Sequence, residues 1–347
     1  MNIGDAWTQT QEALGFAVSR VTGDPDPLNE RESADGNLYV MRVLAAVAES
    51  SLLTVDPRRP AFLPMLESVR YLGACGPDID YDVALILPGA RYRITGERGG
   101  ATFVGIAVYA QSGELGASGI VASMDVDDLV GADGTFSYEF SHPDAARVIV
   151  RQYFHDRSAQ HRGHFRIEQV PPAPVDDLPA LPTVAGMTDR VVNAAESIRW
   201  NAQLNELWSP ERRAVPNEFL RQTPDEIVAA ITNPEVVYAF SWWRLGADEA
   251  LVIEFTPPRT RYWGLQICDR WFQAYPDRRM NLNDQQIAYE PDGSVRLILS
   301  DGDPGHPNWL DTSGHRVGTM FFRWLHADPA LLPRCRVVAV GDIPAAP

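Results

Sequence analysis

The sequence predicts an α+β fold that is mainly β, with two tandem antiparallel sandwich-like units and accessory N-terminal and inter-domain helices. Three observations lead to this prediction. Short segments rich in β-branched and aromatic residues, separated by Gly, Pro and Asp turns, run from about residue 76 and again from 238 to 340. The second series repeats the frame of the first. Apolar residues at helical spacing precede each series.

The N-terminal region is predicted to form two helices, at residues 5–22 and from about 37 to 53. The apolar face of the first pattern carries Trp7, Leu14, Val18 and Val21, and that of the second carries Leu38, Met41, Leu44, Ala48 and Leu52. A Gly-Asp-Pro sequence ends the first helix, and two prolines follow the second. We expect these apolar faces to pack against the β-rich part of the chain.

Proline and helix signals divide the rest of the chain. The proline-rich residues 171–182 predict an extended linker, and helices are predicted again at 184–208 and 224–231. The predicted order is a helical segment at 1–60, a first β-unit at 61–170, the linker at 171–182, a helical segment at 183–232 and a second β-unit at 233–347.

The two β-rich halves align with each other at a nearly constant offset. Residues 102–108 align with 261–267 at an offset of 159, and Arg151 aligns with Arg323 at an offset of 172. The larger offset places an insertion between Ser300 and Arg323 in the second half. The alignment predicts an internal duplication of one β-unit.

Asp269 stands out when the two copies are compared. The apolar residues of 263–267 alternate along one face of a predicted strand, and Asp269 continues that face where the first copy has Ala110. A carboxylate on a core-facing stripe is costly unless it is paired or solvated. Asp269 is therefore either a functional carboxylate or a strand-end salt bridge or turn cap, with Arg270 and Arg323 as the available partners.

The insertion, residues 301–317, carries an unusual density of polar side chains around one aromatic residue. Its members are Asp301, Asp303, His306, Asn308, Trp309, Asp311, His315 and Arg316. Long polar insertions are where sandwich folds place binding loops. Alternatively, the Asp and Asn side chains cap turns while the tryptophan fills a gap. The two histidines with the carboxylates could bind iron or zinc, or could act as an acid–base pair without a metal, which is the prediction adopted.

Two other motifs have weaker functional interpretations. Residues 125–128 spell Asp-Val-Asp-Asp, which we interpret as an exposed acidic turn. His155, His161 and His164 lie close together, but their spacing fits no standard metal-ligand pattern and arginines surround them. We therefore expect no metal site there.

Composition excludes several classes of protein. The net charge of −16 disfavours nucleic acid and anionic membranes as partners. All 30 basic residues are arginine, so Schiff-base chemistry and a phosphate-binding P-loop, which both need lysine, are excluded. The three cysteines are far apart and predict reduced thiols in a cytoplasmic protein. The N-terminus does not resemble a signal peptide, and no apolar run is long enough to span a membrane.

The second half also resembles a known family. The order Asp269-Arg270-Trp271-Phe272, then Asp292-Gly293, then the residues from Asp303 to Thr319 is similar to the C-terminal hallmark of the domain of unknown function 1214 family. That domain often follows the domain of unknown function 1254. The resemblance covers about 233–340 and implies jelly-roll-like β-domains with accessory helices. It implies no particular reaction.

Two functions remain open. The first is an enzyme, a hydrolase or lyase, acting in the second β-unit on a neutral or partly apolar small molecule such as a glycan or glycoside. Its predicted catalytic residues are Asp269, Asp303, Asp311 and His315, and its predicted substrate-binding residues are Trp263, Arg270, Trp271, His306, Asn308, Trp309 and Arg323. The second is a non-catalytic ligand-binding or assembly protein. In both cases we expect no cofactor, a small-molecule ligand and self-association.

Overall fold

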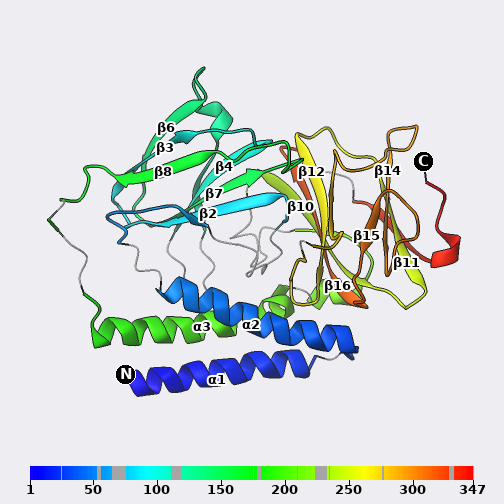
Figure 1. Ribbon diagram of the computed structural model, residues 1–347, viewed down its shortest axis with the longest axis horizontal. Coiled ribbons are helices and arrows are strands. Elements are labelled where there is room, and N and C mark those ends of the chain that lie inside the picture. The colour runs from blue at the N-terminus through cyan, green and yellow to red at the C-terminus, as the bar shows by residue number, and fades with distance from the viewer. Residues whose placement is uncertain are drawn as a thin grey trace. The chain divides into compact units, whose positions relative to one another are not determined.

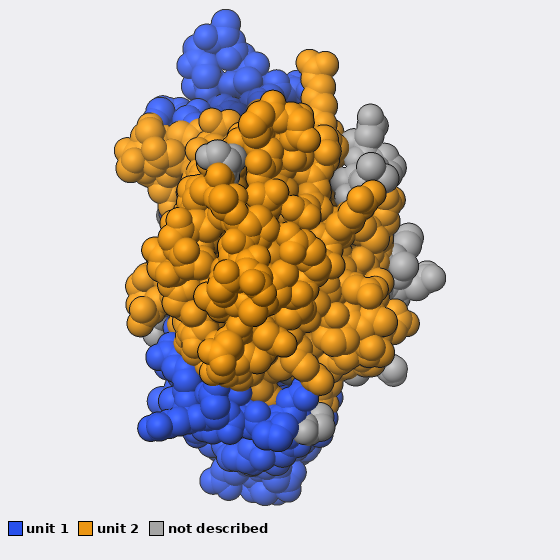
Figure 2. Space-filling view, turned by 90° about the vertical axis from the view of Figure 1, so that its right-hand side faces the viewer, with its two compact units in different colours: residues 1–70, 80–152, 161–204 blue, residues 71–79, 153–160, 205–347 orange. Residues whose placement is uncertain are grey.

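The computed structural model describes most of the chain. The described residues are 1–24, 26–52, 56–64, 76–110, 119–174, 176–177, 181–208, 210–222, 233, 235–275, 277–327 and 332–346. The chain forms two compact units. Unit 1 comprises residues 1–70, 80–152 and 161–204, and unit 2 comprises 71–79, 153–160 and 205–347 (Figure 2). Two short segments of the first half therefore belong to unit 2. The predicted helix at 224–231 lies outside the described residues.

Three long helices belong to unit 1, although the end of the third passes into unit 2. They are α1 (Ile3–Thr22), α2 (Glu30–Leu52) and α3 (Val184–Trp208), and they lie side by side (Figure 1). Helix α2 begins earlier than predicted because Asn29 and Glu32 form a reciprocal capping box. The Asn29 side chain accepts from the Glu32 amide at 2.8 Å, and the Glu32 carboxylate accepts from the Asn29 amide at 3.1 Å.

The buried faces of α1 and α2 differ from those predicted. Trp7 is 55% exposed, Val18 is 41% exposed and Met41 is 63% exposed, so their assignment to the buried faces is wrong. The buried face of α1 is made of Ala6, Ala13, Ala17 and Val21, so the prediction is confirmed for Val21 and missed the three alanines. Small side chains let neighbouring helices approach closely. The prediction of the buried faces followed the large apolar residues and so missed the alanines.

Unit 1 contains two sheets. One has the order β1 (Leu63–Pro64), β2 (Ile79–Leu85), β7 (Ala145–Tyr153), β4 (Phe103–Ala110) and β5 (Ile120–Asp125). The other has the order β6 (Thr135–Ser141), β3 (Arg91–Glu97) and β8 (His164–Gln169). The acidic motif at 125–128 starts the short 3-10 helix η1 (Val126–Asp128), where the Asp125 side chain accepts from the Asp127 amide at 2.9 Å.

Unit 2 contains two sheets of the same kind. The first has the order β13 (Asn281–Asn283), β12 (Tyr262–Asp269), β16 (Val317–Leu325), β10 (Val236–Arg244) and β9 (Leu220–Arg221). The second has the order β15 (Trp309–Asp311), β14 (Val295–Ser300), β11 (Glu249–Phe255) and β17 (Arg334–Ala339). The short helices α4 (Pro210–Ala214) and η3 (Val340–Asp342) complete the described elements of this unit.

The strand orders of the two units correspond, as the internal repeat predicts. The order β2-β7-β4-β5 in unit 1 matches β10-β16-β12-β13 in unit 2, and β6-β3-β8 matches β14-β11-β17. The two-residue strands β1 and β9 occupy matching edges. Strand β15, which pairs in parallel with β14, belongs to the insertion and has no counterpart in unit 1. The predicted fold class, mainly β with accessory helices, is confirmed.

The core of unit 2 lies between its two sheets. Leu265 and Ile267 of β12 pack there with Leu251 and Ile253 of β11, and all four side chains are fully buried. The other face of β12 carries the intervening residues, including Gln266. The alternation predicted for 263–267 is therefore present, with the apolar face inward. None of the described helices is both long and apolar enough to cross a membrane.

Candidate functional site

Asp269, the carboxylate that the sequence places on a core-facing strand, caps a turn inside the core. Its side chain is fully buried. Oδ1 accepts hydrogen bonds from the backbone amides of Trp271 and Gln273, both at 2.9 Å. Oδ2 accepts from Gln273 Nε2 at 2.6 Å and from Tyr275 Oη at 2.8 Å. These are the contacts of the turn-cap alternative, because donors from the following turn surround both oxygens.

The charge state of Asp269 depends on two opposing influences. Burial raises its pKa above the ordinary aspartate value, while the nearby charge of His315 and the donors on the turn lower it. His315 is itself buried, its ring lies 5.8 Å from the Tyr275 ring, and its Nδ1 lies 2.9 Å from the carbonyl oxygen of Thr312. The structure thus brings together Asp269 and His315, two of the four predicted catalytic residues.

The other two predicted catalytic carboxylates serve local turns. Asp303 is exposed, and its Oδ1 accepts from the Gly305 amide at 2.8 Å. Asp311 is partly buried, and its Oδ1 accepts from the Ser313 amide at 2.7 Å. In each case the aspartate side chain accepts a hydrogen bond from the backbone amide two positions ahead, which is the usual geometry of an Asx turn.

The remaining predicted residues of the insertion fix the loop to the sheet. Asn308 is fully buried, accepts from the Ala288 amide at 2.8 Å and donates to the carbonyl oxygens of Ala288 at 2.7 Å and Arg296 at 2.9 Å. Trp309 Nε1 donates to the Ser300 carbonyl at 3.2 Å. His306 Nδ1 accepts from the Asn308 amide at 3.1 Å, and burial lowers the pKa of His306.

The predicted ligand walls and anchors of unit 2 are buried. Trp263 packs in the core against Phe255, with ring centroids 5.1 Å apart and the planes 82° apart. Trp271 is also buried, with the fully buried Arg270 guanidinium 5.7 Å from its ring centroid. Arg323 lies on the other face of the sheet, where its Nη1 donates to Gln266 Oε1 at 2.8 Å.

A buried polar network around Asp78 escaped the sequence analysis. Oδ2 of Asp78 accepts from Tyr262 Oη at 3.0 Å, Asn281 Nδ2 at 2.7 Å and Asn283 Nδ2 at 2.8 Å. Burial raises the Asp78 pKa, and the three donors oppose that rise. The Tyr262 pKa also rises well above 10.0, because of burial and the neighbouring Asp78. Asp78 lies far from Tyr262, Asn281 and Asn283 in the sequence, so no local motif indicates the network.

His155, for which the sequence predicts no role in metal binding, lies beside the same network in unit 2. Its Nε2 lies 3.0 Å from Asp284 Oδ1, and its ring stacks on Tyr262 at 5.5 Å between centroids. Asn283 Nδ2 also donates to the His155 carbonyl oxygen at 2.9 Å. The network thereby fastens residues 76–79 and 153–160 to the strands of unit 2. Within the described ranges, no group of three or more His, Cys, Asp or Glu side chains is placed to hold a metal ion.

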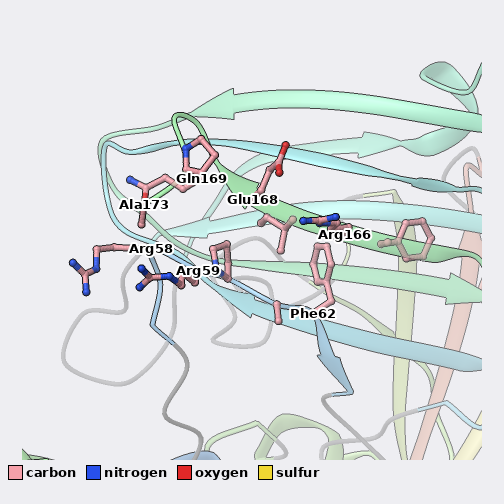
Figure 3. A pocket seen from close by; sticks show the side chains of 12 residues that line it. Arg58, Arg59, Phe62, Arg166, Glu168, Gln169 and Ala173 are labelled. Atoms are coloured by element: carbon pink, nitrogen blue, oxygen red, sulfur yellow. The ribbon is translucent and has the colours of Figure 1, made fainter. Parts of the chain in front are cut away.

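A cavity of about 420 Å³ lies in unit 1 and contains none of the predicted site residues (Figure 3). One wall comes from the segment Arg58, Arg59, Pro60, Ala61 and Phe62, and the other from Phe165, Arg166, Ile167, Glu168 and Gln169 of β8 with Pro172 and Ala173. Figure 3 shows Arg58 and Arg59 on the left of the view, with Phe62 and Arg166 to their right. The two walls lie about a hundred positions apart in sequence, so only the fold brings them together.

Ion pairs fix two of the three arginines of the cavity. Arg58 Nε lies 3.0 Å from Asp56 Oδ1, and Arg59 Nη1 lies 3.1 Å from Asp56 Oδ2. The hydrogen bonds from Arg58 hold the pKa of Asp56 below its usual value. Arg58 also pairs with Asp177. Arg166 is exposed and forms no side-chain hydrogen bond or ion pair within the described part of the chain.

The structure is thus that of a duplicated β-sandwich protein with an arginine-lined cavity in its first unit. Part of its second unit is similar to a family known from sequence. Residues 216–334 match the model of the family described as Protein of unknown function (DUF1254). This range contains the motif residues from Asp269 to Thr319. No curated protein matches the chain.

One solved structure shows the same fold. An uncharacterized protein from Burkholderia cenocepacia is 25% identical, with 98% of each chain covered and a TM-score of 0.90. The VPA0106 protein from Vibrio parahaemolyticus is 13% identical over 87% of this chain and 98% of its own, with a TM-score of 0.48. The first of these similarities extends over both units.

Proposed function

We propose that the chain is a non-catalytic small-molecule-binding protein whose ligand occupies the cavity between the 58–62 segment and strand β8. The observation that carries this proposal is the cavity itself, about 420 Å³ in volume, with aromatic, proline and charged side chains on its walls. Small-molecule sites in proteins are commonly concave, a few hundred Å³ in volume, largely apolar and equipped with a few polar groups.

The contacts of the predicted catalytic residues favour binding over catalysis. A general acid or base must reach its substrate within hydrogen-bond distance. Asp269 is enclosed with donors on both oxygens, and Asp303 and Asp311 hold their own turns. A hydrolase or lyase built on these carboxylates would have to break the contacts that shape unit 2.

Two narrower statements belong to the same proposal. Kinship of the second β-unit with the domain of unknown function 1214 family is supported by the order of its Asp-Arg-Trp-Phe, Asp-Gly and insertion motifs. A cytoplasmic location is supported by Cys268 and Cys335, which are thiols and not members of a disulfide.

The proposal can be tested by blocking the cavity. Ala61 lines it and is exposed, so Ala61→Trp can fill the space without disturbing a buried contact. The full chain would be titrated by calorimetry with single-ring and short-chain compounds, charged and neutral. We expect saturable binding that Ala61→Trp abolishes and that Ala132→Trp, at an exposed turn outside the cavity, leaves intact.

Two results would contradict the proposal. If every compound that binds the native chain also binds Ala61→Trp with unchanged affinity, the cavity is not the ligand site. If a bound compound is converted to a product, detected by mass spectrometry of the titrated sample, the protein is not a non-catalytic binder.

A further inference from the structure

We infer that the ligand of the unit 1 cavity is an organic oxyanion, with a carboxylate or phosphate head bound by Arg166 and a flat apolar body. This inference rests on the proposed function and specifies the class of ligand. It begins with the charges on the walls, which are three arginines and one glutamate.

Most of these charges already have partners. Arg58 and Arg59 share Asp56, and Glu168 Oε1 lies 3.2 Å from Arg93 Nη1, a residue outside the cavity lining. Arg166 is the one lining residue of either sign whose charge is not balanced by an ion pair among the described residues. The local charge left for a ligand is therefore positive.

The guanidinium group determines what that charge can bind. It is planar, always protonated and presents paired N–H donors that match the two oxygens of a carboxylate or phosphate. A neutral amide of the same shape offers only one acceptor oxygen and no charge. Arg166 should therefore distinguish an oxyanion from its neutral isostere.

The rest of the lining suits an apolar body. Phe62 and Phe165 supply aromatic side chains, and Pro60 and Pro172 supply aliphatic surface. Flat rings pack favourably on such surfaces, which bury them without requiring hydrogen bonds. The protein carries a net charge of −16, so its overall field repels anions. Selection for an anion must therefore come from the local contact at Arg166 and not from long-range attraction.

The test compares benzoate with benzamide, which have the same size and ring but differ in charge. Calorimetric titration of the full native chain at fixed ionic strength should show benzoate binding about fivefold or more tightly, the value of an exposed ion pair of about 1 kcal/mol. Arg166→Gln should remove this preference, and Arg166→Lys should restore part of it because lysine keeps the charge without the planar fork.

The control is Arg91→Gln. Arg91 is an exposed arginine of strand β3 that does not line the cavity, so this variant changes the net charge of the same unit by the same amount. It should keep the benzoate preference. Titration with phenyl phosphate, compared with benzoate, shows which head group fits better, and tighter binding of either one supports an oxyanion site.

The outcomes separate this inference from the proposed function. Equal binding of benzoate and benzamide, with both lost in Ala61→Trp, would leave the cavity as a binding site but overturn the oxyanion class. A benzoate preference that survives in Arg166→Gln would overturn the role of Arg166. No binding of any of the three probes would overturn both, because the cavity is large enough for a single ring.

Discussion

Tyr262 donates its hydroxyl hydrogen to Oδ2 of Asp78 at 3.0 Å, a bond between residues 184 positions apart in the chain. Two asparagines, Asn281 and Asn283, donate to the same oxygen. Because Asp78 is 7% exposed, these donors replace the water that an exposed carboxylate would have. The bond holds a segment of the first half of the chain to the sheet of unit 2.

Removing the donor should cost less than removing the acceptor. Tyr262→Phe leaves Oδ2 with two donors, and we expect a loss of about 1 kcal/mol in the free energy of unfolding. Asp78→Ala leaves three donors, two of them on buried residues, without their acceptor, and we expect a loss of about 3 kcal/mol. Urea unfolding followed by tryptophan fluorescence reports mainly on unit 2, where most of the nine tryptophans lie. Equal losses in the two variants would contradict this account.

The pH dependence of stability should carry a contribution from Asp78. Its folded-state pKa lies above the ordinary value of 3.8, so the folded state binds more protons than the unfolded state between these two pKa values. The stabilising contribution of Asp78 to the free energy of unfolding is therefore complete below pH 3.8 and is lost as the pH rises through the folded-state pKa. In Asp78→Asn this contribution disappears. The difference in unfolding free energy between native protein and variant, measured from pH 3.5 upward, should decrease with rising pH in that window and then level off. A difference that increases with pH would overturn the direction of the shift.

Gly264 makes room for the Tyr262 hydroxyl. A Cβ atom at position 264 would lie 2.6 Å from Oη and 3.2 Å from Cζ of Tyr262. Gly264→Ala should therefore push the ring away from Asp78 and lower the free energy of unfolding by about 1–3 kcal/mol. The loss should be smaller in a Tyr262→Phe background, where the clashing oxygen is absent.

A second glycine provides the control for that substitution. Gly15 lies within helix α1, and a Cβ there would meet nothing within 4 Å. Gly15→Ala should be neutral or should stabilise the protein by about 0.5–1 kcal/mol, because alanine loses less backbone entropy in a helix. A destabilising Gly15→Ala combined with a neutral Gly264→Ala would contradict the steric explanation.

Asp269→Asn tests whether the buried carboxylate holds the turn. In asparagine, an NH₂ group replaces one of the two carboxylate oxygens. That NH₂ group would face either the two backbone amides or the side chains of Gln273 and Tyr275, which are themselves hydrogen-bond donors. We expect a loss of about 1–3 kcal/mol in the free energy of unfolding and a lower thermal midpoint. An unchanged midpoint, measured by differential scanning calorimetry, would return Asp269 to the functional alternative.

Asn308 and Asp303, from the same insertion, should respond very differently to alanine. Asn308 makes three hydrogen bonds to the backbone of two other segments and is fully buried, so Asn308→Ala should cost about 2–3 kcal/mol. Asp303 is exposed and caps one turn, so Asp303→Ala should cost about 0.5 kcal/mol. Chemical denaturation of both variants measures the difference, and comparable costs would argue against the role of Asn308 as a loop anchor.

Much of the fold could be predicted because its signals are local or periodic. Alternation along 263–267 identifies the inward face of β12 from neighbouring residues alone. A nearly constant offset between matching residues of the two halves predicts the duplication, and the larger offset at Arg323 locates the insertion that contains β15. The helix faces were harder, since the buried alanines of α1 are less apolar than the exposed Trp7.

The sequence by itself determined the two-unit β architecture, the core-facing position of Asp269 and the polar character of the 301–317 insertion. Only the tertiary structure decided what these groups contact. It placed turn donors on both oxygens of Asp269, brought Asp78 to Tyr262, and formed a cavity from Arg58 to Phe62 and the residues of β8. The physical reason is that alternation and spacing are properties of neighbouring residues, whereas hydrogen-bond partners and cavity walls come from segments that meet only when the chain folds.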